Sequence, residues 1–80
     1  MDDADLVRRI SVLADEERRL EASIDGPDDA AADAARLREI EVSLDQCWDL
    51  LRQRRARRTA GADPDDAAVR PPSTVEGYRQ

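Results

Sequence analysis

The sequence predicts an all-α protein: an antiparallel two-helix hairpin of coiled-coil type, followed by an irregular C-terminal tail. Three observations predict it. Two long stretches carry apolar residues at helical spacing, a Gly-Pro connector separates them, and the C-terminal stretch contains Pro and Asp but few apolar side chains. The chain has 80 residues, 40% of them charged, and its aromatic side chains are one Trp and one Tyr. That suits one small domain, which we divide into a hairpin at 1–61 and a tail at 62–80.

The first helix is expected over about residues 5–24. Its apolar residues follow alternating four- and three-residue steps, the spacing of a coiled-coil seam, and they are Leu6, Ile10, Leu13, Leu20 and Ile24. Glu17 places a charge in the same stripe. We expect its carboxylate either to reach Arg36 or Arg38 across the hairpin or to fix the register of a dimer.

The second helix is expected over about residues 28–59. The Asp-Gly-Pro-Asp segment at 25–28 supplies a cap for one helix and a start for the next, and Gly61 and Pro64 end the second helix. Its stripe consists of Ala30, Ala34, Leu37, Ile40, Leu44, Cys47, Trp48 and Leu51. The short connector forces antiparallel packing, and the longer second helix then projects about 15 Å past the first.

Two helices alone leave one side of this apolar stripe in contact with water. A homodimer that closes into a four-helix bundle would cover that side. A second copy of the chain is therefore the first partner that we expect.

Charge is unevenly distributed along the chain. The net charge is −6, yet residues 51–60 contain five arginines and no acid: Arg52, Arg54, Arg55, Arg57 and Arg58. Three interpretations stay open. The cluster complements the helix C-terminus and pairs with acids near the N-terminus or in the tail, it docks an acidic surface of another protein, or it binds nucleic acid.

Cys47 and Trp48 form the next candidate site. The expected role of Cys47 is that of a small apolar filler beside Trp48, the largest side chain of the expected core; if buried, truncation of Trp48 would cost about 3–5 kcal/mol. A thiol-based redox sensor at Cys47 is the alternative, although the chain has no His to activate the thiol.

The tail offers Val69, Val75 and Tyr78 as apolar anchors. It is either disordered, folded back with Tyr78 near Trp48 or Leu51, or a linear docking motif for another protein. The Ser-Thr-Val-Glu segment at 73–76 resembles a capping box and predicts one helical turn.

The composition also excludes several classes of function. With no His, and with Arg as every basic residue, the chain lacks the side chains of most catalytic and metal sites, so we expect no enzyme activity, no cofactor, no metal and no small-molecule substrate. The acidic start is unlike a signal peptide and no apolar run is long enough for a membrane span. We therefore expect a cytoplasmic protein that does not bind membranes.

The stretch Leu-Asp-Gln-Cys-Trp-Asp-Leu-Leu-Arg-Gln-Arg-Arg-Ala at 44–56, together with Arg70-Pro71 and the Val-Glu-Gly-Tyr segment at 75–78, resembles a family of short actinobacterial proteins of unknown function. The resemblance implies no activity, cofactor or catalytic residue. It implies that the tail belongs to the same unit as the Arg-rich helix, which favours a tail that folds back.

These observations predict a small non-catalytic protein–protein interaction or regulatory module that uses its helical seam and its Arg-rich helix end. The candidate partner-binding residues are Arg52, Arg54, Arg55, Arg58, Trp48 and Tyr78. A nucleic-acid-associated protein that binds through the 52–58 cluster and a redox sensor at Cys47 are the alternatives.

Overall fold

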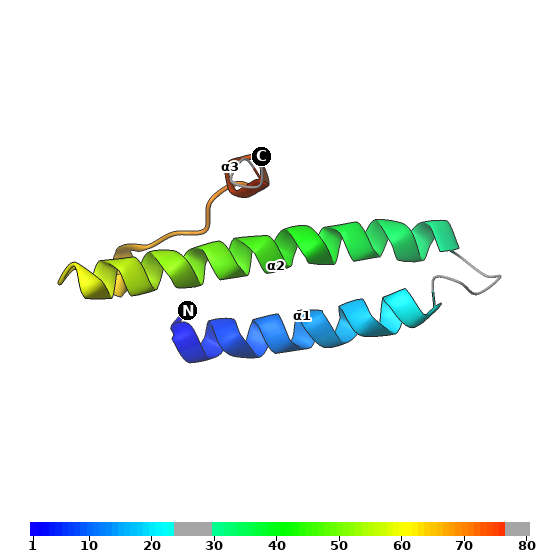
Figure 1. The fold of residues 1–80 in the computed structure, drawn as a ribbon, viewed down its shortest axis with the longest axis horizontal. Helices are drawn as coiled ribbons and strands as arrows, with labels where there is room; N and C mark the ends of the chain where they lie inside the picture. Colours follow the sequence, from blue (N-terminus) through cyan, green and yellow to red (C-terminus); the bar gives the residue numbers. More distant parts are fainter. Residues whose placement is uncertain (24–29, 77–80) are drawn as a thin grey trace.

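The computed structural model describes residues 1–23 and 30–76, and every regular element in this part of the chain is helical. The elements are α1 (Asp3–Ser23), α2 (Ala30–Thr59), the 3₁₀ turn η1 (Pro64–Asp66) and α3 (Pro72–Glu76). The two long helices lie side by side and the tail returns along the opposite side of α2, in a molecule of 52 × 27 × 15 Å (Figure 1). The all-α prediction is confirmed.

α1 begins two residues earlier than the sequence predicted, because its first turn is closed by a reciprocal cap. The Asp5 amide donates to Asp2 Oδ1 at 2.8 Å, and the Asp2 amide donates to Asp5 Oδ2 at 3.1 Å. This arrangement satisfies backbone donors that a helix start otherwise leaves unpaired. The Asp2 amide, followed by Arg8, holds the pKa of Asp5 below its ordinary value.

The end of α2 agrees with the prediction. Gly61 adopts a φ of 75°, its amide donates to the Arg58 carbonyl at 3.1 Å, and the Ala62 amide donates to the Arg57 carbonyl at 2.7 Å. These two bonds form a Schellman motif, for which glycine is favoured because a positive φ strains other residues. The predicted connector at 25–28 and Ile24 lie outside the described residues.

Ion pairs at the two ends of the hairpin define its antiparallel register. Near the connector, Arg36 donates to both oxygens of Glu16, at 2.8 and 3.2 Å, so the carboxylate that reaches Arg36 is Glu16 and not the expected Glu17. At the other end Asp3 contacts α2 near its C-terminus. α2 continues past the start of α1, as the difference in helix length predicted (Figure 1).

The core lies between the inner face of α2 and α1. Its buried apolar members are Leu6, Ile10, Leu13, Ile40, Cys47, Leu50 and Leu51, with Leu20 and Leu44 partly buried at its border. One expectation was wrong: Leu50 is a core residue, whereas Trp48 is 45% exposed. At 100° per residue, Leu50 and Trp48 lie on opposite flanks of the Cys47–Leu51 stripe, and α1 covers the Leu50 flank.

The tail folds back along α2, which is one of the three arrangements that the sequence left open. Val75 in α3 is only 4% exposed. The predicted helical turn is present, but it begins at Pro72, so Ser73 lies inside the turn and does not cap it. Tyr78 lies outside the described residues.

The four-helix-bundle dimer involves a second copy and stays a prediction. Among the described residues, no helix combines the length and the apolar composition that crossing a bilayer requires.

Candidate functional site

Arg54 joins three segments of the chain at one end of the hairpin. Its guanidinium donates through Nε to Asp3 Oδ1 at 2.6 Å, and through Nη1 to Asp65 Oδ1 at 2.9 Å and to the Pro64 carbonyl at 3.2 Å. Arg58 donates to the second oxygen of Asp3 at 2.6 Å. We call these four side chains, Asp3, Arg54, Arg58 and Asp65, the arginine clamp.

The clamp shows that part of the arginine cluster is neutralised within the chain. Arg54 is only 6% exposed, and its bond to Asp3, followed by that to Asp65, raises its pKa. Hydrogen bonds from Arg54 and then Arg58 hold the pKa of Asp3 below its ordinary value of 3.8. Pairing with acids was one of the three interpretations of the cluster, and it applies to Arg54 and Arg58.

A second polar site holds the tail further along α2. Asp49 is 2% exposed, and its Oδ2 accepts from Gln53 Nε2 at 2.9 Å and from Arg70 Nε at 3.0 Å. Gln53 also donates to the Ala68 carbonyl at 2.9 Å, and Gln46 donates to the Arg70 carbonyl at 3.2 Å. The path of the tail is therefore fixed by bonds to its backbone as well as to its side chains.

The sequence reasoning missed Asp49, Gln53 and Arg70. A signal for the first two exists, because at 100° per residue positions 46, 49 and 53 share one side of α2 opposite the apolar stripe. No local pattern identifies Arg70, whose partner Asp49 is 21 residues away in the sequence.

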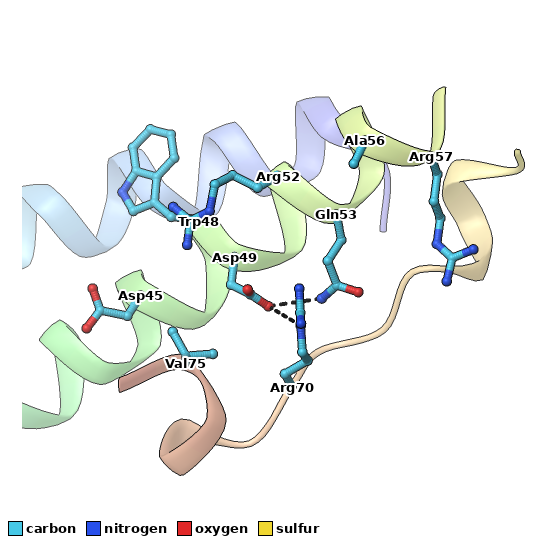
Figure 2. Close-up of a pocket in the computed structure, with 9 residues that line it drawn as sticks. All are labelled: Asp45, Trp48, Asp49, Arg52, Gln53, Ala56, Arg57, Arg70 and Val75. Atoms are coloured by element: carbon cyan, nitrogen blue, oxygen red, sulfur yellow. Dashed lines mark hydrogen bonds and ion pairs between the residues drawn. The ribbon is translucent and has the colours of Figure 1, made fainter. Parts of the chain in front are cut away.

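Between α2 and the tail lies an open hollow of about 770 Å³, which we call the outer groove. α2 lines it with Asp45, Trp48, Asp49, Arg52, Gln53, Ala56 and Arg57, and the tail lines it with Arg70 and Val75. In Figure 2, Trp48 and Arg52 stand on one side of the groove, Arg70 and Val75 on the other, and Arg57 lies toward the end of α2. The groove thus has an apolar part and a cationic part.

The remaining arginines of the cluster differ from the clamp residues. Arg52 and Arg55 are exposed and Arg57 is half-buried. Within residues 1–23 and 30–76, none of these three guanidinium groups makes a hydrogen bond or an ion pair. Arg52 and Arg57 line the outer groove, whereas Arg55 does not.

Cys47 is buried in the core beside Leu6 and Leu50. A small hollow of about 190 Å³ lies next to it, lined also by Met1 and Val69. Burial of the thiol among apolar side chains suits a filler and makes it slow to react in the native state.

The described residues contain no group of three or more Cys, Asp or Glu side chains placed to hold a metal ion. Among the residues whose burial the structure describes, the strongly buried charged groups are Asp49 and Arg54, and both make hydrogen bonds within the chain.

Comparison with known proteins places the chain among relatives whose roles are not described. Residues 2–80 match the sequence model of a family described as "Protein of unknown function (DUF2630)". The chain belongs to this family. Uncharacterized proteins from Mycobacterium tuberculosis and Mycobacterium bovis are 48% identical to it over 77 residues, which is 95% of this chain and 88% of each relative.

No solved structure matches the chain. Membership of DUF2630 confirms the resemblance to a family of unknown function, and the match covers the tail as well as both long helices. The outer groove therefore lies entirely within the segment that defines the family match.

Proposed function

We propose that this protein is a small non-catalytic protein-interaction module whose docking surface is the outer groove. The sequence pointed to the helical seam and the Arg-rich helix end as the binding surface. In the single chain, α1 fills the seam and the clamp engages Arg54 and Arg58. The docking surface therefore lies on the opposite side of α2.

The observation that carries the proposal is the exposed indole of Trp48. It is the one Trp of the chain, it is 45% exposed, and it stands beside the exposed Arg52 in a groove. Trp and Arg are the residue types most enriched at the energetic centres of protein interfaces. Exposing a Trp to water forgoes the burial free energy that a small domain needs, and a partner that covers the indole would recover it.

The groove is also held in place before any partner arrives. Its floor is a helix, and its far side is fixed by the bonds that Asp49 and Gln53 make to Arg70 and Ala68. A surface that is already ordered loses little conformational entropy on binding, which favours affinity.

A capture experiment tests this proposal. The full chain is immobilised beside the variants Trp48→Ala and Val12→Ala, and proteins retained from a lysate are quantified. Val12 is the matched control, because it is an apolar residue exposed on α1, away from the groove. We expect one or more proteins to be retained by the wild type and by Val12→Ala and lost with Trp48→Ala. Identical retention by both variants would show that the groove is not the docking surface.

Nucleic-acid binding is the second candidate, and one observation favours it. Trp48 and Arg52 are one helical turn apart, and an exposed aromatic side chain next to Arg can stack on an unpaired base. Against it, Asp45 and Asp49 line the same groove and the chain carries a net charge of −6, which repels phosphates. Binding of an oligonucleotide that weakens steeply with salt would support this candidate.

We also propose a homodimer, and its test is independent of the test of the outer groove. Light scattering at about 50 mM and about 500 mM salt measures the mass directly. High salt screens ionic contacts and leaves apolar contacts intact, so the comparison separates the two kinds of association. A dimer stable at both concentrations would support apolar closure into a four-helix bundle.

A further inference from the structure

We infer that the partner of the outer groove is an acidic peptide segment that carries an apolar anchor side chain. This inference rests on the proposed function and names the chemistry of the partner. The anchor would contact Trp48, and carboxylates of the segment would pair with Arg52 and Arg57.

The first support is the position of the two cations. At 100° per residue, Arg52 and Arg57 leave α2 on either side of Ala56 and Gln53, which form the floor between them. Their Cα atoms are separated by about 7.5 Å along the helix axis, at 1.5 Å per residue. Carboxylates two residues apart in an extended chain are spaced by about 6.6 Å. An extended acid-x-acid segment that lies along α2 therefore has a carboxylate spacing close to the axial spacing of the two Arg Cα atoms.

The second support is that neither cation has a partner within the described residues, while the neighbouring Arg54 and Arg58 do. The helix dipole stabilises only one of these two arginines. Favourable interaction with the C-terminal end of a helix is confined to the last turn, which contains Arg57 and Arg58 but not Arg52. Arg52 is thus an exposed cation without an internal role, and bidentate pairing with a carboxylate is the interaction that guanidinium geometry favours.

The two ends of the groove give the segment a direction. Trp48 and Val75 lie at the end near Asp45, whereas Arg57 lies toward the C-terminal end of α2 (Figure 2). The acidic residues of the segment therefore lie toward the C-terminal end of α2, and its apolar anchor lies toward Trp48.

The small number of available cations favours a protein segment over nucleic acid. Pairing with Arg52 and Arg57 releases few counterions, and counterion release is the main source of affinity for phosphates. The net charge of −6 also repels a phosphate backbone.

Trp48 makes the test direct, because it is the one Trp of the chain and its fluorescence reports on the groove alone. The probe is the capped peptide acetyl-Ala-Leu-Ser-Glu-Ser-Glu-Ser-amide, and its control replaces both Glu by Gln. We expect saturable quenching or shift of the emission with the Glu peptide at low salt. We also expect about tenfold weaker binding of the Gln peptide, the sum of two exposed ion pairs.

Variants of the protein locate the binding. Replacing Arg52 and Arg57 together by Gln should weaken the Glu peptide by about the same factor, because the same two pairs are lost. Arg38→Gln is the matched control, because Arg38 is an exposed arginine on α2 that does not line the groove. An equal loss with Arg38→Gln would mean non-specific attraction and would overturn the inference.

The other outcomes separate this inference from the proposed function. Equal affinity for the Glu and Gln peptides, or no response to either, overturns the acidic segment, while the Trp48-dependent capture described above decides independently whether the groove docks a protein. Tighter binding of a twelve-nucleotide oligothymidylate overturns both. Self-association that Trp48→Ala abolishes would identify a second copy as the occupant and would also overturn the acidic segment.

Discussion

The two faces of α2 contact their neighbouring segments through different types of interaction. The inner face presents Ile40, Cys47, Leu50 and Leu51 to α1, all of them buried and apolar. The outer face contacts the tail through Asp49 and neighbouring polar side chains, which form hydrogen bonds at 2.9 to 3.2 Å. Apolar burial is roughly proportional to area and does not depend on direction, whereas hydrogen bonds fix distance and angle.

That difference assigns different roles to the two faces. The inner face supplies most of the free energy of folding. The outer face selects one path for the tail and so shapes the groove, and each of its hydrogen bonds adds only about 0.5–1.5 kcal/mol, because it replaces a hydrogen bond to water. Substitutions on the inner face should therefore mainly lower the free energy of unfolding, whereas substitutions on the outer face should mainly change the path of the tail and the shape of the groove.

The largest effect is expected from a truncation on the inner face. Leu51 is 1% exposed, and Leu51→Ala should lower the free energy of unfolding by about 2–5 kcal/mol through lost burial and a cavity. Urea denaturation followed by circular dichroism measures it. Val12→Ala, at an exposed site, should change it by less than about 0.5 kcal/mol; comparable losses in both variants would contradict the assignment of the core.

Val75→Ala tests the one strongly buried apolar anchor of the described tail. Removing two carbon atoms should cost about 1.5 kcal/mol. Because Val75 and Trp48 line the same groove, the emission of Trp48 should shift as well. A loss of stability without any change in Trp48 emission would contradict the packing of α3 beside the groove.

A smaller effect is expected from acid, through the arginine clamp. Arg54 and Arg58 lower the pKa of Asp3 in the folded chain below its ordinary value of 3.8. The clamp therefore stabilises the fold fully at pH values well above 3.8, and this contribution is lost as the pH falls through the lowered pKa. Melting temperatures between neutral pH and pH 2 should fall less steeply in Asp3→Asn than in the wild type. Asp66→Asn, at an exposed tail position, should leave the slope unchanged.

Trp48→Ala should cost less than the truncation of a fully buried side chain. Because the indole is 45% exposed, only part of its burial free energy is lost, and we expect the free energy of unfolding to fall by about 1–2 kcal/mol, below the 3–5 kcal/mol of a buried Trp. Urea denaturation followed by circular dichroism measures this change. A cost as large as that of Leu51→Ala would place Trp48 in the core and remove the basis of the proposed docking surface.

The sequence was sufficient to predict the hairpin because local signals define it. The spacing of Leu6, Ile10 and Leu13 predicted one face of α1, and Gly61 predicted the end of α2; the structure agrees in both places. Trp48 was misplaced for a physical reason. Cys47, Trp48 and Leu51 all fit one broad stripe, and hydrophobicity favours the indole inside. Periodicity alone does not say which flank of that stripe the partner helix will cover.

The polar contacts of the tail were the part that the sequence could not reveal. The sequence placed Arg54 in a cluster of five arginines without identifying its partners, and those partners, Asp3 and Asp65, are 51 and 11 residues away. Many acids of the chain could have filled those roles, because charge attracts at a distance without specifying a partner. Only the packed helices bring these particular carboxylates within hydrogen-bond distance of one guanidinium.

The bonds of Arg54 also couple two segments that are far apart in the sequence, the start of α1 and the tail. Its bond to Asp3 closes a loop of almost the whole hairpin, and its bond to Asp65 closes a short one. Whichever closure forms first orders the guanidinium and lowers the entropic cost of the other. The N-terminal turn of α1 and the tail should therefore open together as one cooperative unit in native-state hydrogen exchange.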